Sequence, residues 1–252
     1  MDFYSIKNQM IDFLKTETKR IGVEKVVVGI SGGLDSAIVA VLCKEAFGSN
    51  LLGVLMPSHL SSQSSIDDAK KLCNKFDIHY EIVQIAPMVE GYFNNMQDAT
   101  PLRIGNFSAR IRMAVLYDIS ARENGIVVGT SNKSEILLGY GTHYGDTACA
   151  INPLGEIYKS DEFEFAKYLG VIDEIIQKKP SADLWEGQSD EEELGYSYKT
   201  MDNMLKKLID QKIPKEQLIQ NEDDKKLIEM LEYRIKANAF KGQLPVIAQL
   251  KF

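Results

Sequence analysis

Hydrophobic residues in the first half of the chain switch repeatedly between helical and strand-like spacing. Apolar side chains from Phe3 to Leu14 recur every three or four positions, which predicts an amphipathic N-terminal helix. Short β-branched or apolar runs predict four buried strands, at residues 25–30, 51–57, 78–85 and 125–132. Helices are expected between them at residues 36–47, 64–76 and 106–123. Strands that alternate with helices predict an α/β fold, with a doubly wound parallel sheet covered on both faces.

The pattern changes after about residue 150. Helical spacing returns at residues 160–169 and 171–177, and again near residues 200–211, 214–220 and 223–240. Residues 178–198 show no clean period, and a stretch of this length is typical of a functional loop. We therefore expect a single domain over residues 1–252. An α/β nucleotide-binding core (1–150) would carry a mainly helical extension with an active-site loop (151–252).

Composition excludes several classes of protein. The 252 residues are 26% charged and 44% hydrophobic, which is typical of a globular protein. A net charge of −7 gives no overall attraction to nucleic acid, so we expect no nucleic-acid partner. No apolar run has transmembrane length and the N-terminus does not resemble a secretory signal, so we expect a cytoplasmic protein with no membrane partner. Cys43, Cys73 and Cys149 are odd in number, which favours reduced thiols.

Residues 31–36, with the sequence SGGLDS, lie between the first predicted strand and the next helix. A helix N-terminus after such a turn presents unpaired N–H groups that can bind phosphate. The loop lacks the lysine of a P-loop and the G-x-G-x-x-G of a dinucleotide-binding turn, so neither of these applies. Asp35 would repel a phosphate unless a cation such as Mg²⁺ lay between them. Alternatively Asp35 merely caps the helix, and the loop alone does not decide between these interpretations.

The same six residues resemble the signature loop of the N-type ATP pyrophosphatases, which cleave ATP between the α- and β-phosphates. Five further segments resemble bacterial ammonia-dependent NAD synthetases: residues 105–113, 129–135, 144–146, 152–159 and 180–198. The resemblance runs from about Val26 to Leu244. It implies an adenine-nucleotide alpha-hydrolase type of sheet, with ATP as co-substrate and Mg²⁺ as cofactor. It also implies amidation of nicotinic acid adenine dinucleotide (deamido-NAD) to NAD by ammonia, through an acyl adenylate, with release of AMP and pyrophosphate.

The resemblance also implies roles for individual residues. Mg²⁺ would be bound by Asp35 and Glu135. ATP would be bound by Gly29, Ile30, Ser31, Gly32, Gly33, Leu34, Asp35, Ser36, Thr130, Lys159 and Ser181. Deamido-NAD would be bound by Arg110, His143, Phe240 and Lys241. The catalytic residues would be Lys159, which neutralises charge on the departing pyrophosphate, and Asp146, which binds ammonium or accepts a proton from it.

Each of these residues also has a purely structural interpretation. Glu135 could be an exposed carboxylate in the first turn of a helix, where the helix dipole favours it. Lys159 could be a surface lysine at the end of a strand-like stretch. Arg112, on the same predicted helix as Arg110, could be a solvated charge. Asp146 could merely hold a turn after Gly145, and for this residue the two interpretations are close to equal.

The chain departs from the family pattern at several positions. His143 and Ala150 replace a lysine and an aspartate that serve the dinucleotide in relatives, and Phe240 replaces a histidine. Ser181 replaces a threonine but keeps the hydroxyl. We therefore expect Arg110 and Lys241 to carry more of the dinucleotide binding.

The resemblance further implies a homodimer with the dinucleotide site at the interface. The N-terminal helix and the helix at 106–123 have larger apolar faces than a small sheet can cover, which suits such an interface. About thirty residues precede the loop, too few for an amidase domain, so ammonia is the expected nitrogen donor.

Two rival functions are another amidating or thiolating ATP pyrophosphatase and a non-catalytic nucleotide sensor. The match at residues 178–198 argues against the first, and the pair Asp35 and Glu135 argues against the second.

Overall fold

The computed structural model describes residues 1–252 except 95, 97, 182–188 and 251–252. Its sheet has four parallel strands: β1 (Lys25–Gly29), β2 (Leu51–Leu55), β3 (Tyr80–Ile82) and β4 (Gly125–Val127). Their order is β3-β2-β1-β4, with Val27 opposite Leu52 on one side and Val127 on the other. The chain therefore moves outward from β1 to β3 and returns to the opposite side of β1. This reversal confirms the doubly wound α/β fold, and ligands of such sheets bind at the reversal point.

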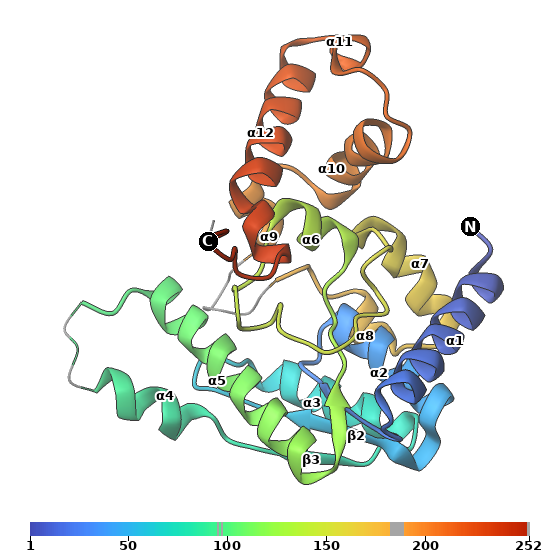
Figure 1. Ribbon diagram of the computed structural model, residues 1–252, viewed down its shortest axis with the longest axis vertical. Helices are drawn as coiled ribbons and strands as arrows, with labels where there is room; N and C mark the ends of the chain where they lie inside the picture. Colours follow the sequence, from blue (N-terminus) through green and yellow to red (C-terminus); the bar gives the residue numbers. More distant parts are fainter. Residues whose placement is uncertain (95, 97, 182–188, 251–252) are drawn as a thin grey trace.

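Helices cover both faces of the sheet (Figure 1). Val26 and Val28 of β1 face a core shared with α1 (Phe3–Ile21), α2 (Leu34–Phe47), α3 (Gln63–Lys75), α7 (Lys159–Leu169) and α8 (Asp173–Ile176). Val27 faces the opposite core, against α4 (Ala86–Phe93) and α5 (Pro101–Arg122). All three valines are fully buried, which explains the continuous apolar run that predicted this strand.

Several boundaries differ from those predicted. The strands β3 and β4 are shorter than expected, and Val128, the residue after β4, instead forms an isolated parallel bridge with Ile151. Helix α5 begins at Pro101, five residues before its predicted start, because Thr100 caps it by accepting a hydrogen bond from the Arg103 N–H at 3.3 Å. A proline is well suited to this first position. The sequence pattern missed α4 entirely, and it gave no bounds for the short helix α6 (Lys133–Leu138).

The extension forms a second, smaller core above α6 and α7. Its elements are α9 (Asp190–Leu194), α10 (Tyr198–Leu205), a π-helical turn (Lys206–Asp210), α11 (Lys215–Leu218), α12 (Glu222–Asn238) and a 3₁₀ turn (Ala239–Gly242). Met201 and Leu205 of α10 pack with Ile228 and Leu231 of α12, and Leu138 of α6 joins them. The predicted loop at 178–198 thus includes one short helix, α9. Figure 1 shows α10 to α12 standing beyond α6, away from the sheet.

Candidate active site

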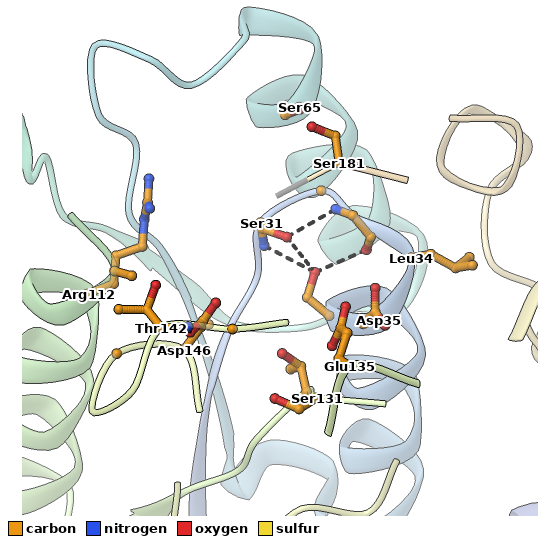
Figure 2. Close-up of a pocket in the computed structure, with 18 of the residues that line it drawn as sticks. Ser31, Leu34, Asp35, Ser65, Arg112, Ser131, Glu135, Thr142, Asp146 and Ser181 are labelled. Carbon is orange, nitrogen blue, oxygen red and sulfur yellow. Dashed lines mark hydrogen bonds between the residues drawn. The ribbon is translucent and has the colours of Figure 1, made fainter. Parts of the chain in front are cut away.

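A cavity of about 810 Å³ opens at the carboxyl ends of β1, β2 and β4, where the strand order reverses. This volume is within the range of small-molecule sites. Residues 29–36 line it from the glycine loop, Val54–Pro57 from the end of β2 and Val127–Ser131 from the end of β4. The extension contributes Lys159, Ser181 and Lys241 to its lining. Figure 2 shows the inner part of this cavity.

The glycine loop is held by two serine hydroxyls (Figure 2). Ser31 Oγ accepts a hydrogen bond from the Gly33 N–H at 3.1 Å, and Ser36 Oγ accepts one from the Ser31 N–H at 3.2 Å. Gly32 has a φ of +81°, and a Cβ added there would lie 2.1 Å from the carbonyl oxygen of Ser65 in α3. The loop therefore requires glycine at this position both for its φ and for the close approach of α3.

Asp35 does not cap α2, so that structural interpretation is wrong. The N-cap residue is Gly33, and Asp35 lies in the first helical turn. Its Oδ1 accepts a hydrogen bond from Asn132 Nδ2 at 2.7 Å, and its Oδ2 is paired with Lys159 Nζ. Burial by itself would raise the pKa of Asp35, but the charge of Lys159 and hydrogen bonds with Glu162, Lys159 and Asn132 together lower it below the ordinary value. Asp35 is therefore a carboxylate held in the first turn of α2, where it lines the cavity.

Glu135 lies beside Asp35 in Figure 2, at the start of α6. It completes a capping box, in which Asn132 Oδ1 accepts from the Glu135 N–H at 3.0 Å and Glu135 Oε2 accepts from the Asn132 N–H at 3.2 Å. Glu135 is half-buried and lines the cavity, so its interpretation as an exposed carboxylate is wrong. Burial and the negative charge of Asp35 raise the pKa of Glu135 well above its ordinary value.

Two facing carboxylates suit a small hard cation. In the part of the chain that the structure describes, there is no cluster of three or more Asp, Glu, His or Cys side chains able to hold a metal. A two-carboxylate set nevertheless fits Mg²⁺, which is usually bound by one or two carboxylates together with substrate phosphates and water. The repulsion that raises the pKa of Glu135 would be relieved by a divalent cation between Glu135 and Asp35.

Lys159 is a buried residue with 4% of its surface exposed, and it begins α7. The expectation that it ends a strand-like stretch is therefore wrong, as is its interpretation as a surface lysine. Its Nζ contacts Asp35 and lies 3.4 Å from an oxygen of Glu162, one helical turn further along α7. Burial would lower the pKa of Lys159, but the surrounding carboxylates raise it, so the ammonium stays charged inside the cavity.

Asp146 holds a turn, as its structural interpretation predicts. Its Oδ1 accepts a hydrogen bond from the Thr142 N–H at 2.5 Å, and Asp146 also lines the cavity. Burial raises the pKa of Asp146, although backbone N–H groups oppose this shift. A carboxyl with a raised pKa accepts a proton more readily than an ordinary aspartate. The turn-forming bond and a chemical role for Asp146 are therefore compatible.

The four residues expected to bind deamido-NAD gather around residues 139–144. Arg110 Nε donates to the carbonyl oxygen of His143 at 3.2 Å, and Lys241 Nζ donates to the carbonyl oxygens of Gly139 and Gly141 at 2.7 and 3.0 Å. The His143 ring meets the Phe240 ring edge-on, with centroids 5.4 Å apart. Lys241 lines the cavity, whereas the other three lie outside its described lining. Thr130 and Ser181, expected to contact ATP, both line it.

Arg112 is not a solvated charge. Its Nε donates to the Met56 carbonyl oxygen at 3.1 Å at the end of β2, and its guanidinium reaches Ser58 and Ser61. Arg112 therefore supports the cavity wall. Sequence reasoning also missed Asn132 and Glu162, both fully buried beside Asp35 and Lys159. The N-x-x-E spacing of a capping box, and the three-residue spacing between Lys159 and Glu162, were the available signals.

The reversed strand order, and the glycine loop that opens α2 at the reversal, define a nucleotide-binding α/β protein of the adenine-nucleotide alpha-hydrolase type. The family model for NAD synthase matches residues 6–245. An NH₃-dependent NAD⁺ synthetase of Wolinella succinogenes is 54% identical over 247 residues, covering 98% of this chain and 96% of that protein. The chain belongs to the NAD synthase family, as its sequence motifs indicated.

Two solved structures agree with this assignment. The NH₃-dependent NAD synthetase of Campylobacter jejuni superposes with a TM-score of 0.83 at 40% identity, covering 99% of this chain and 100% of that chain. An NMN synthetase of Francisella tularensis superposes with a TM-score of 0.87 at 29% identity, with the same coverage. The described part of the chain contains no helix long and apolar enough to cross a membrane.

Proposed function

We propose that this chain is an ammonia-dependent NAD synthetase, a ligase that amidates deamido-NAD at the expense of ATP. This proposal rests on one observation: Asp35, Glu135 and Lys159 lie together in the cavity beside the glycine loop. Family membership supports the same reaction. A nucleotide sensor would not require a buried ammonium between carboxylates, so this rival is disfavoured by the site itself.

In the first half-reaction, the nicotinate carboxylate attacks the α-phosphorus of ATP and pyrophosphate leaves, which produces an acyl adenylate. The N–H groups at the start of α2 bind phosphate oxygens, and the Lys159 ammonium takes up charge on the leaving pyrophosphate. Mg²⁺, held by Asp35 and Glu135, would neutralise phosphate charge. Thr130 and Ser181, which both line the cavity, are proposed to supply polar contacts to ATP. The chain mainly positions two nucleotides and compensates charge.

In the second half-reaction, ammonia attacks the acyl carbon, AMP leaves and a proton is lost. Asp146 lines the cavity near Glu135 and is proposed to bind ammonium or accept this proton. Its raised pKa supports this role, because a stronger base removes a proton more readily. The hydrogen bond to Thr142 fixes the carboxylate in place.

The acceptor subsite is proposed to involve Arg110, His143, Phe240 and Lys241. Lys241 lines the cavity, whereas Arg110 and Phe240 are exposed and His143 is half-buried. This placement supports a site completed by a second copy of the chain in a homodimer. Exposed apolar residues on α1 and α5, among them Tyr4 and Tyr117, supply surface for such an interface.

We also propose that the chain works as one domain in the cytoplasm. Ile151, Leu154 and Phe165 belong to the same core as β1 and α2, so the extension and the sheet share buried residues. Free, buried thiols at Cys43 and Cys73 are compatible with a reducing compartment.

The test is an assay of the purified chain with ATP, Mg²⁺, deamido-NAD and an ammonium salt. Equal amounts of NAD, AMP and pyrophosphate are expected. Xanthosine monophosphate and nicotinic acid mononucleotide serve as alternative acceptors, and glutamine as an alternative nitrogen donor. Preference for either alternative acceptor, or sustained turnover with glutamine alone, contradicts the proposal. Light scattering at assay dilution tests the dimer, and a fully active monomer contradicts that part.

A further inference from the structure

A chain of buried hydrogen bonds runs beneath Lys159 and joins three helices. Asp202 of α10 has no exposed surface, and its Oδ2 accepts from the Ser160 N–H at 2.8 Å. Its Oδ1 accepts from the hydroxyl of Ser134 in α6 at 2.6 Å. That hydroxyl oxygen in turn accepts from the Lys159 N–H at 3.0 Å. The helical extension thereby holds the two helices that carry Glu135 and Lys159.

This chain of bonds substitutes for an ordinary helix cap. The N-cap residue of α7 is Tyr158, whose side chain makes no capping hydrogen bond. The first two N–H groups of α7 are satisfied by Asp202, directly at Ser160 and through Ser134 at Lys159. A carboxylate at a helix N-terminus is favourable, and here it comes from an element more than forty residues away in the sequence.

We propose that Asp202, acting through Ser134, is a positioning residue for adenylate formation. It fixes the first turn of α7 against the first turn of α6, so that the Lys159 ammonium is held facing the phosphate site. Asp202 and Ser134 are both fully buried and lie outside the described cavity lining. This inference rests on the proposed role of Lys159 at the pyrophosphate. Small displacements of a catalytic group can cost large factors in rate, which makes the effect measurable.

If the Ser134 hydroxyl only stabilised the fold, its removal would lower the melting temperature without a specific loss of adenylate formation. Two serine variants separate this role from positioning. Ser134→Ala removes the link to the Lys159 N–H but leaves the bond between Asp202 and Ser160. Ser120→Ala is the matched control, because Ser120 is also buried and donates one hydrogen bond, to the Tyr117 carbonyl oxygen at 3.1 Å. Ser120 lies near the far end of α5, away from the cavity. Each substitution deletes one buried hydroxyl, and Ser134→Ala loses two hydrogen bonds where Ser120→Ala loses one.

The experiment measures exchange of labelled pyrophosphate into ATP in the presence of deamido-NAD, which reports the first half-reaction alone. We expect Ser134→Ala and Asp202→Asn to slow exchange by about tenfold or more. We expect the KM for ammonia to stay unchanged in these variants. The melting temperature of Ser134→Ala should fall further than that of Ser120→Ala, because Ser134 makes two buried hydrogen bonds and Ser120 makes one. Slower exchange in Ser120→Ala, or normal exchange in Ser134→Ala, overturns the inference.

A second arm places Ser134→Ala in a Lys159→Met background. If the bond acts through Lys159, the serine substitution has no further effect on exchange there. A further tenfold loss in that background overturns the inference while leaving the proposed role of Lys159 intact. Normal exchange in Lys159→Met alone overturns that proposed role and this inference with it, so the two failures are distinguishable.

Discussion

Replacing Gly32 by alanine tests whether the glycine loop is shaped by its contact with α3. Gly32 has a φ of +81°, and its added Cβ would lie 2.1 Å from the Ser65 carbonyl oxygen and 2.9 Å from the carbonyl carbon. Both are backbone atoms in the first turn of α3, which cannot rotate away. Either α3 or the loop must shift.

Gly22 provides the matched control, because it has a similar positive φ without the contact. Its φ is +85°, and no described atom lies within 4 Å of an added Cβ. Gly22→Ala therefore measures the left-handed conformation alone, at about 1–2 kcal/mol. Gly32→Ala adds an overpacking cost of about 1–3 kcal/mol, so its total destabilisation is about 2–5 kcal/mol.

Urea unfolding of both variants measures this difference, and pyrophosphate exchange measures its effect on the site. We expect Gly22→Ala to keep wild-type exchange and Gly32→Ala to lose most of it, because the N–H groups of the loop move away from the phosphates. Equal destabilisation of the two variants, together with an unchanged KM for ATP in Gly32→Ala, would refute the reasoning.

Three further predictions concern charged residues of the site. Asp35→Asn and Glu135→Gln should fold normally and need far more Mg²⁺ for pyrophosphate release; near-wild-type rates at limiting Mg²⁺ would contradict their role as metal ligands. Arg110→Ala should raise the KM for deamido-NAD by an amount equivalent to about 1.5–3 kcal/mol. His143→Ala keeps the backbone carbonyl that is bonded to Arg110, so it should raise the KM for deamido-NAD only a few-fold. The KM for ATP should be unchanged in both variants. A larger loss at His143, or one that falls on ATP, would show that the subsite is misplaced. Burial raises the pKa of Asp146, so protonation should disable it at low pH, and activity per free ammonia should rise with pH through that pKa. Asp146→Asn should flatten this profile, and an unchanged profile would exclude Asp146 as the proton acceptor.

The features that could be predicted from the sequence are local ones. A β-branched run, a glycine-rich turn and an apolar helix follow one another between residues 25 and 47, and all three occur in the structure within two residues of their expected bounds. The helix α4 was missed because its apolar sequence, APMVEGYF, continues directly from a run that reads as a strand. Such short apolar stretches do not separate helix from strand by periodicity.

The features that could not be predicted depend on packing between distant segments. Glu162 follows two charged or polar residues in sequence, a pattern that predicts an exposed helix position. It is nevertheless fully buried, because α7 packs on α2. Asp202 similarly reads as one polar residue of an amphipathic helix. Its role as the cap of α7 arises only where α10 meets α7, and no spacing in the chain encodes that contact.

The charges brought together by this packing explain why the sheet alone would make a poor phosphate site. Asp35 and Glu135 follow strands of the core, and they would repel the phosphates that the glycine loop attracts. The opposing ammonium comes from Lys159 in the extension, and Glu162 beside it adds a third carboxyl group. Burial and then the charge of Asp35 raise the pKa values of both Glu135 and Glu162, and Lys159 only partly opposes these shifts. A divalent cation entering with ATP would supply the missing positive charge. In the proposed mechanism, the extension therefore supplies one positive charge and the cation would supply the rest.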